Sequence, residues 1–444
     1  MQPGGLPQRM AQELGRLLGP DFPKHLGLAV SGGGDSMALL YLAAPWARVM
    51  GITLWPVTVD HGLRAESAGE AAMVARACAE LGLTHTTLRW HWDGHGNVQA
   101  AGRAARLALM DRWRAGVEHI LFAHTQDDVA ETFLMRLARG SGVDGLAVME
   151  ARHPVHPHPA GYPALDPADI TGPHPPIPER RVAGVPAYTN GFDVIRPLLT
   201  TTRAELRHYL KVLQIDYVDD PSNDDPRYDR VKMRQAQPAL DALGLTAPRL
   251  AETARHMARA QEVLTDQAWA AHQRLAATGP GEQLFDIAYD RDGFAALPGE
   301  LQLRLLAAAL QFVSLNPYRP RLTALEDARD RALGGGATTL HGGYVLPHRA
   351  QLYICAEHAQ IRDTRPENGR WRGVYPTPAA DIRALGEQGA AQIRHLSDLP
   401  ARVLWPCPAV WDVDTVVSCP RIGQLDRWKP AAGHARLQRI FRMR

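Results

Sequence analysis

The stretch LGLAVSGGGDSMALLYLAA, residues 26–44, joins two apolar runs of different period through three consecutive glycines. Leu26–Val30 is a short apolar run typical of a buried parallel strand, and apolar residues recur at helical spacing from Met37 onward. Glycine at such a strand-to-helix junction permits positive φ and close approach of a ligand, while the helix adds unpaired N–H donors. The junction therefore predicts an anion-binding loop, with a tight turn capped by Asp35 or Ser36 as the alternative.

Two common glycine motifs for nucleotides do not account for this loop. A Walker A loop requires GxxxxGK[ST], and the chain contains no Gly-Lys pair. A GxGxxG pattern occurs at Gly140, Gly142 and Gly145, but it follows the helix-like run AETFLMRLAR rather than a strand. The pattern predicts a helix end and a loop, so nicotinamide chemistry is disfavoured.

Strand-like and helix-like runs alternate after the glycine loop. ITLWPVTVD (52–60), HTTLRW (85–90) and HILFAH (119–124) are strand-like, whereas the runs at 70–83 and 99–113 are helix-like. This alternation predicts an α/β fold with a doubly wound, mainly parallel sheet, whose ligands bind outside the carboxyl ends of the strands. SGGGDS, DHGLR and AHTQDD all fall at that edge, which predicts a nucleotide site.

Acidic residues follow the fourth predicted strand. Thr125 and Asp128 fit a helix N-cap with an acid three residues later, and such acids can simply complement the helix dipole. However, Asp127 and Glu131 share a helix face next to the predicted loop, where carboxylates repel phosphate unless Mg²⁺ intervenes. We therefore expect metal or substrate contact there, and His124 is either a strand-end histidine or a nucleotide contact.

These motifs carry a family resemblance. SGGGDS is similar to the SGGxDS loop of the N-type ATP pyrophosphatases, the PP-loop superfamily, which cleave ATP between the α- and β-phosphates and pass AMP to a substrate. Together, VDHGLRAES, AHTQDDVAETFLMRLARGSGVDGL, RPLL at Arg196–Leu199 and DDPSNDDPRYDRVKMR resemble the tRNA(Ile)-lysidine synthetase family over residues 26–235. Thr125 stands where the family usually has a second histidine and Val231 where it usually has Asn, so neither inherits a role.

The resemblance implies a ligase of known chemistry. Such an enzyme adenylates the C2 carbonyl oxygen of the wobble cytidine of tRNA(Ile) with a CAU anticodon, and the ε-amine of free L-lysine then displaces AMP. Lysidine formation changes codon reading from AUG to AUA, and the implied cofactors are ATP and Mg²⁺. Adenylation supplies a leaving group on a poor electrophile. Lysine must also lose a proton, which costs roughly 4 to 5 kcal/mol at neutral pH.

The resemblance and the residue types together define candidate site residues. The ATP-binding loop comprises Ser31, Gly32, Gly33, Gly34, Asp35 and Ser36. The candidates for catalysis, including the base that accepts the lysine proton, are Asp35, Asp60, His124, Asp127, Asp128 and Glu131. The candidate metal ligands are Asp35, Asp127 and Asp128. The candidates for contact with substrate or tRNA are Arg64, Arg103, Arg106, Arg196, Asn223, Arg230, Arg234, Arg436 and Arg439.

Length and composition set the wider frame. A chain of 444 residues predicts two or three domains, and its 45% hydrophobic and 22% charged residues are typical of a globular protein. The net charge of +2 means that a polyanionic partner must be held by a local patch. The four cysteines form no CxxC pair or zinc-ligand spacing, which favours a reducing compartment. Without a secretory signal or a long apolar run, we expect a cytoplasmic protein that spans no membrane.

Composition along the chain predicts three regions. Residues 1–200 form the ATP pyrophosphatase domain, in which the Pro- and His-rich segment 151–190 is a surface insertion without packed elements. A Thr202–Glu205 capping box opens a helical substrate- or tRNA-binding region, 201–333. Residues 334–444 form a small β-containing tRNA-recognition domain with a basic end.

Alternative functions are separable. A tRNA thiolase of the same superfamily would need paired cysteines, and a zinc deaminase would need HxE with PCxxC, which is missing. A catalytically inactive tRNA-binding homologue is disfavoured by the intact Ser31, Gly33, Asp35 and Ser36. The sequence leaves the general base and the oligomeric state open, including a homodimer.

Overall fold

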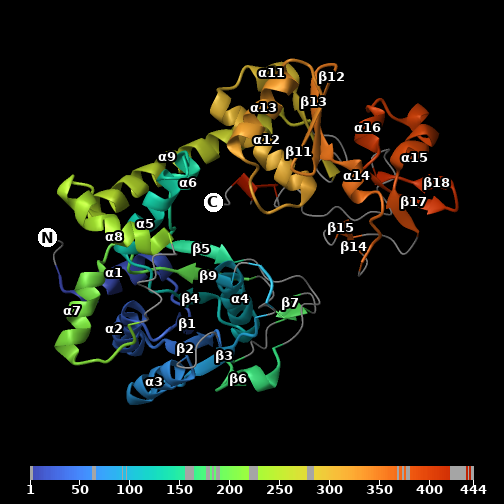
Figure 1. Cartoon of the computed structure of the whole chain (residues 1–444). Coiled ribbons are helices and arrows are strands. Elements are labelled where there is room, and N and C mark those ends of the chain that lie inside the picture. The colour runs from blue at the N-terminus through green and yellow to red at the C-terminus, as the bar shows by residue number, and fades with distance from the viewer. Residues whose placement is uncertain are drawn as a thin grey trace. The chain divides into compact units, whose positions relative to one another are not determined.

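The computed structural model of the chain consists of two compact units, residues 1–259 and 260–444, which are treated separately (Figure 1). The residues that the structure describes are 4–62, 67–92, 94–96, 98–155, 165–176, 181–182, 185–186, 191–219, 229–277, 285–367, 370–372, 375–376, 381–420, 437–438 and 440–441. The predicted division at residues 200 and 333 stays a prediction.

Unit 1 is built on a seven-stranded sheet of order β5-β9-β4-β1-β2-β3-β6. The strands are β1 (His25–Ala29), β2 (Thr53–Asp60), β3 (Thr86–Arg89), β4 (His119–Leu121), β5 (Arg152–Val155), β6 (Ile170–Thr171) and β9 (Phe192–Ile195). The inner five pair in parallel, and the edge strands β5 and β6 are antiparallel to their neighbours. This confirms the predicted fold class.

Helices cover both faces of this sheet (Figure 1). In unit 1 the structure describes α1 (Leu6–Leu18), α2 (Gly34–Met50), α3 (Ser67–Glu80), α4 (Val98–Trp113), α5 (Gln126–Leu137), α6 (Val143–Leu146), α7 (Arg203–Leu213), α8 (Asp229–Ala242) and the start of α9 (Ala247–Leu275). Apolar residues of α1, α2, α3 and α7 share one core with Leu26 and Leu28, whereas α4 packs with Val57 and Ile120 on the other face. A parallel sheet buried on both faces explains the continuously apolar strands.

The segment 151–190 contains packed elements, so the prediction of an unpacked insertion is wrong at two places. β5 pairs with β9, and β6 pairs with β3 after a short 3₁₀ turn at Pro167–Asp169. Pro154 is tolerated because β5 is an edge strand, where one face of the backbone needs no partner. The β7–β8 hairpin, Arg181–Val182 and Val185–Pro186, also lies here.

Unit 2 begins within α9 and holds two further cores. The first packs α11 (Arg291–Ala295), α12 (Gly299–Ser314) and α13 (Leu322–Leu333) on an antiparallel sheet of β10 (Asp286–Asp290), β13 (Gln351–Ala356), β12 (Gly343–His348) and β11 (Thr338–Leu340). Leu437 and Phe441, near the chain end, are buried in this core. β10 lies inside the predicted helical region 201–333, in which the other elements that the structure describes are helices.

The second core of unit 2 surrounds a three-stranded antiparallel sheet of β16 (Ile382–Ala384), β17 (Pro408–Asp412) and β18 (Thr415–Ser418). The other elements of this part are α14 (His358–Ile361), β14 (Arg370–Trp371), β15 (Tyr375–Pro376), α15 (Gly386–Gln392), a 3₁₀ turn at Arg394–Leu396 and α16 (Ala401–Leu404). These antiparallel sheets confirm the predicted β-containing C-terminal region. Within the described ranges, no helix is both long and apolar enough to cross a membrane.

Candidate active site

The glycine loop between β1 and α2 is closed by two serine hydroxyls. Ser36 Oγ donates to the Gly33 carbonyl (2.9 Å) and accepts from the Ser31 N–H (3.1 Å). Since the Ser36 proton is engaged, Ser31 Oγ donates across the 3.2 Å that separates the two hydroxyls. Gly33 is the N-cap of α2, and no side chain among the described residues caps it. The first N–H groups of α2 are therefore left for an anion.

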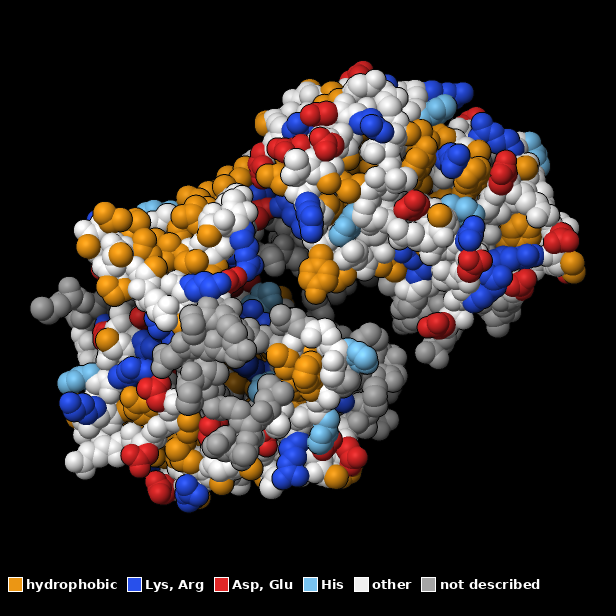
Figure 2. Space-filling model, in the orientation of Figure 1, with side chains coloured by type: hydrophobic (Ala, Val, Ile, Leu, Met, Phe, Trp, Pro, Cys, Tyr) orange, Lys and Arg blue, Asp and Glu red, His pale blue; other side chains and the backbone are white. Residues whose placement is uncertain are grey.

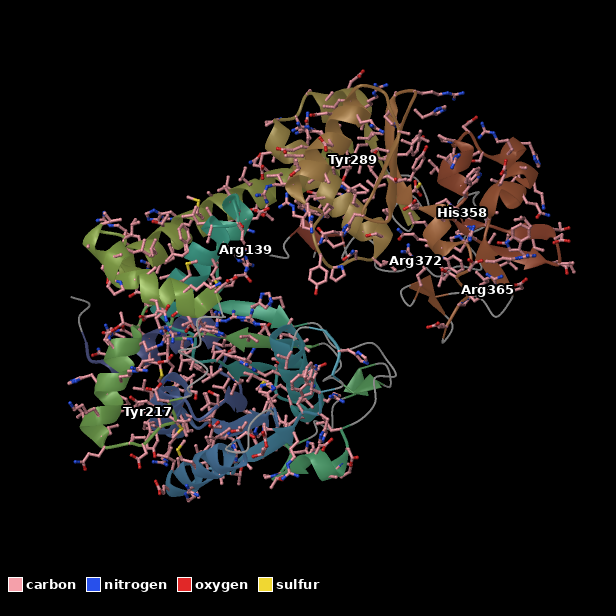
Figure 3. All side chains as sticks on the ribbon, viewed as in Figure 1. Arg139, Tyr217, Tyr289, His358, Arg365 and Arg372 are labelled. Carbon is pink, nitrogen blue, oxygen red and sulfur yellow. The ribbon has the colours of Figure 1, made fainter. Side chains whose placement is uncertain are left out.

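The structural reason for glycine differs among the three glycine positions of the loop. Gly32 has φ +87°, a left-handed conformation that favours glycine, whereas Gly33 has an ordinary φ of −71°. At Gly34, a Cβ would lie 3.2 Å from Cδ2 of Tyr217, so the missing side chain makes room for that ring. Figure 3 labels Tyr217 near α7, and the adjacent Val218 N–H donates to the Gly32 carbonyl (2.9 Å). The residues after α7 thus pack against the glycine loop and hydrogen-bond to it.

An acidic cluster, Asp35, Asp127, Asp128 and Glu131, is gathered around Arg203 at the start of α7. The guanidinium contacts Asp35 Oδ2 at 3.1 Å, Asp128 Oδ1 at 3.4 Å and Glu131 Oε1 at 3.2 Å. The Arg203 N–H donates to Asp127 Oδ2 (2.7 Å). One cation therefore ties the acid of the glycine loop to the acids of α5.

Charge and burial shift the pKa values in this cluster in opposite directions. Burial raises the pKa of Asp35, and Asp128 and Asp127 raise it further against the opposing effect of Arg203. Burial would also raise the pKa of Asp128, but Arg203, His124 and the Thr125 N–H together hold it below its usual range. Asp35 is therefore the carboxylate whose charge this environment accommodates least well.

The acids fit Mg²⁺ in only one of its usual modes. Within the part of the chain that the structure describes, no three His, Cys, Asp or Glu side chains are grouped to hold a metal ion. Mg²⁺ at nucleotide sites, however, takes one or two carboxylates together with phosphate oxygens. Asp35, beside the glycine loop and crowded by like charges, suits that mode, and the three-residue metal site stays a prediction.

His124 is held as a neutral ring by Arg196. Arg196 Nε donates to His124 Nδ1 (3.1 Å), so the proton of the neutral imidazole is on Nε2. Burial lowers the pKa of His124 to about 4, with Asp128 opposing and Arg196 reinforcing the shift. The ring is stacked parallel to Phe122, with centroids 5.9 Å apart. At neutral pH His124 is therefore a hydrogen-bond donor through Nε2.

An arginine cluster close enough to interact electrostatically with Asp128 consists of Arg103, Arg106, Arg136, Arg196 and Arg230. Burial, with Arg230 and Arg136, lowers the pKa of Arg103, and burial, with Arg103 and Arg230, lowers that of Arg106. Burial and Arg103 lower the pKa of Arg196 to about 10. These guanidiniums repel one another, which is the electrostatic pattern of a site for an anion.

The remaining predicted residues lie in different places. Arg234 contacts Glu131 Oε1 (3.1 Å) and so belongs with the acids. Asp60 accepts the Gly62 N–H (2.9 Å) in a turn at the carboxyl end of β2. Four predicted site residues lie outside the described residues: Arg64, Asn223, Arg436 and Arg439.

Sequence reasoning missed Arg203, Tyr217, His61 and Trp90. The His61 and Trp90 rings meet edge to face with centroids 5.4 Å apart, at the carboxyl ends of β2 and β3. His61 Nδ1 is buried without a hydrogen-bond partner among the described atoms, and burial and Arg106 lower the pKa of His61 to about 4. The position of Asp60-His61-Gly62 after a predicted strand indicated this sheet edge, but nothing in the motif indicated a role for the His61 side chain. No local pattern marked Arg203, which follows a capping threonine.

Comparison with known proteins defines the class of this site. Residues 6–166 and 177–239 match the model of the PP-loop domain. The chain is 36% identical to the tRNA(Ile)-lysidine synthase of Ruegeria pomeroyi, over 91% of this chain and 90% of the relative. It is 42% identical to that of Bradyrhizobium diazoefficiens, over 70% of this chain and 80% of the relative. The chain is thus a PP-loop protein.

Within that class, the chain belongs to the tRNA(Ile)-lysidine synthase family. A U34-tRNA thiolase of Methanococcus maripaludis is a distant structural neighbour, with 15% identity and a TM-score of 0.41 over 57% of this chain and 78% of that one. Likeness at that level carries no argument about activity.

Proposed function

We propose that this chain is a ligase that uses ATP to attach free lysine to C2 of the wobble cytidine of tRNA(Ile), releasing AMP and pyrophosphate. The observation that carries the proposal is the contact between Arg203 and Asp35. It joins the phosphate-binding loop to the buried acids of α5 in a chain of the tRNA(Ile)-lysidine synthase family.

The glycine loop supports the first half-reaction. The uncapped N-terminus of α2 and the hydroxyl-closed loop favour the β- and γ-phosphates of ATP, which leave as pyrophosphate. Asp35 with one acid of α5 would hold Mg²⁺, which when bound supplies charge neutralisation for the phosphates. His61 and Trp90 at the same sheet edge present an aromatic surface and an orphan ring nitrogen to a nucleobase.

The acidic cluster supports the second half-reaction. Glu131 Oε1 accepts from both Arg203 and Arg234, while Glu131 Oε2 is buried with no partner in the described part of the chain. That oxygen is available to a cationic ammonium such as that of lysine. His124 is disfavoured as the base for the attacking amine because Nδ1 is engaged and Nε2 carries a proton. The base is therefore sought among the carboxylates.

The arginine cluster supports binding of the third substrate. A phosphate that binds between mutually repelling guanidiniums lowers their electrostatic free energy, and tRNA offers such phosphates beside the wobble base. A tRNA substrate would place the reaction in the cytoplasm. A homodimer stays a prediction.

The test is reconstitution with defined substrates. Purified protein, ATP, Mg²⁺, lysine and unmodified tRNA(Ile) should yield pyrophosphate and a nucleoside heavier than cytidine by lysine less water, detected by mass spectrometry after digestion. Omitting lysine should abolish the new nucleoside, and tRNA with a guanosine at the wobble position serves as the matched control. If sulfur enters the tRNA instead, the chain is a thiolase; binding of tRNA without pyrophosphate release would identify an inactive homologue.

A further inference from the structure

An exposed tyrosine stands out in unit 2. Among the described aromatic residues with large exposed side chains are Trp92, 42% exposed, and Tyr318, 78% exposed. Tyr289, Tyr344 and Tyr353 of this unit are, by contrast, buried or half-buried. A single exposed apolar side chain needs no explanation in itself. The loop that carries Tyr318, however, is built to hold it in place.

The loop between α12 and α13 is fixed by hydrogen bonds from both sides. The Tyr318 N–H donates to Asn316 Oδ1 (3.0 Å), and Gln311 Nε2, on a nearly buried side chain, donates to the Pro317 carbonyl (2.9 Å). Pro317 and Pro320, which flank the tyrosine, restrict the backbone further. The ring is therefore presented to solvent from a backbone with little freedom to lose on binding.

A second segment supports the base of the loop. Arg372, labelled in Figure 3, donates to the Val313 carbonyl (2.6 Å) and the Ser314 carbonyl (2.8 Å) at the end of α12. α12 ends at Ser314, and the next residue, Leu315, has a left-handed φ of +62° that stops the helix. These bonds anchor the loop to residues more than fifty positions away in the sequence.

The charge around Tyr318 favours a polyanion. Between Leu301 and Leu325 the sequence contains no Asp or Glu, whereas Arg319 and Arg321 both follow the tyrosine, one on each side of Pro320. Arg321 and Leu322 are exposed beside it. On the face of unit 2 seen in Figure 2, Lys and Arg side chains are otherwise interspersed with acidic and apolar ones. A rigid aromatic ring followed by arginines is an arrangement by which proteins stack unpaired nucleobases and hold the adjoining phosphates.

We propose that Tyr318 is a stacking platform for an unpaired base of the tRNA substrate, with Arg321 at the neighbouring phosphate. This inference rests on the proposed function, which supplies the tRNA, but it concerns a surface that takes no part in the chemistry. Stacking of one base is worth about a fivefold to hundredfold change in affinity. Stacking releases no counterions, so it leaves the salt dependence unchanged, whereas a lost phosphate contact lowers the slope by about 0.7 to 0.9.

The experiment measures the affinity of full-length protein for unmodified tRNA(Ile) at several salt concentrations. Tyr318→Ala and Tyr318→Leu should weaken binding at least fivefold with an unchanged salt slope, and Tyr318→Phe and Tyr318→Trp should bind within twofold of wild type. Arg321→Gln should flatten the slope. Val413→Ala, at a side chain that is 79% exposed in the same unit, is the matched control and should bind normally. ATP affinity without tRNA should be the same in all variants.

The possible outcomes separate this inference from the proposed function. If wild type does not bind tRNA(Ile), the proposed function fails and this inference fails with it. If wild type binds and Tyr318→Ala binds equally well, only the stacking role is overturned. Loss of self-association in Tyr318→Ala with unchanged tRNA binding would identify a contact between copies of the chain instead. Equal loss in Tyr318→Phe would also overturn stacking, because the phenyl ring keeps the π face.

Discussion

The acidic cluster and the arginine cluster lie in the same unit, where Asp128 interacts electrostatically with Arg103 and Arg230, yet the two clusters differ in how their charges are satisfied. The acids are neutralised from within, because the Arg203 guanidinium bonds Asp35, Asp128 and Glu131. Arg234 donates to the same Glu131 oxygen. Burial and neighbouring guanidiniums instead lower the pKa values of Arg103, Arg106 and Arg196. The difference indicates that the acidic cluster carries its own counter-ion, whereas repulsion between cations remains in the arginine cluster.

Removing the internal cation should produce the largest effect. Arg203→Ala leaves Asp35, Asp128 and Glu131 buried without their counter-ion, which we expect to cost about 3 to 5 kcal/mol of unfolding free energy, measured by chemical denaturation. Arg203→Lys keeps the positive charge but loses the branched set of guanidinium donors, so its loss of unfolding free energy should be smaller than that of Arg203→Ala. Equal stability of Arg203→Ala and wild type would contradict the idea that the acids depend on this residue.

Asp35 should separate activity from stability. Because its pKa is raised, its negative charge weakens folding above the unfolded pKa, and that penalty grows as pH rises toward the folded value. Asp35→Asn should therefore unfold at the same or a higher denaturant concentration at pH 7, while pyrophosphate release falls about a hundredfold or more. A clear loss of stability in Asp35→Asn would show that its contact with Arg203 outweighs the crowding by acids.

Substitution in the arginine cluster should lower the affinity for tRNA without lowering stability, unlike substitution of Arg203. Arg103→Gln relieves repulsion from Arg230 and Arg136, so the unfolding free energy at low salt should be unchanged or higher. Affinity for tRNA should fall about tenfold, with a salt slope lower by about 0.7 to 0.9. Arg112→Gln, on the same helix, is the control and should leave the slope unchanged. A strongly destabilised Arg103→Gln would sink the description of this cluster as internally repulsive.

A smaller effect distinguishes two glycines of the loop. Gly33→Ala fits the free protein, since the nearest atom to the new Cβ is 3.7 Å away and φ is −71°. Its melting temperature should match wild type, so any loss of pyrophosphate release reports on close approach of phosphate. Gly32→Ala is strained at φ +87° and should lower stability by about 1 kcal/mol. Equal stability of the two variants would contradict the assigned backbone roles.

The smallest effect concerns pH. His124 has a lowered pKa of about 4, so the unfolded state binds the proton more readily, and stability is lost as pH falls from about 6.5 toward about 4. In His124→Gln the unfolding free energy should fall less steeply across that range. Activity between pH 6 and 8 should keep the same profile shape in wild type and variant, because the ring stays neutral there.

Local patterns predicted the local structure around this site, and the reasons for what they missed are physical. The Thr125–Asp128 and Thr202–Glu205 capping boxes both form, because each depends on residues within four positions. The contact of Arg203 with Asp35 joins residues 168 apart, and no periodicity encodes it. Composition also misled at β5, since an edge strand accepts the proline and histidine that suggest a loop.

The three glycines of the loop show the same limit at finer scale. From the sequence they are equivalent, and all three were expected to serve the phosphate. The structure gives Gly32 a left-handed backbone and Gly34 a close tyrosine ring. That distinction depends on Tyr217, which lies in a segment far along the chain. Only the fold brings the two together.

The burial of Leu437 and Phe441 in the first core of unit 2 also has a consequence for how the chain is made. Phe441 packs against Trp269 and His272, with ring centroids 5.5 Å and 5.7 Å apart. During synthesis those two residues leave the ribosome long before Phe441 does, and their apolar neighbours stay exposed to solvent until then. Unit 1 can fold while the ribosome is still translating. A chain truncated before residue 437 lacks two side chains of this core, so the apolar residues that they cover stay exposed and proteases can recognise them.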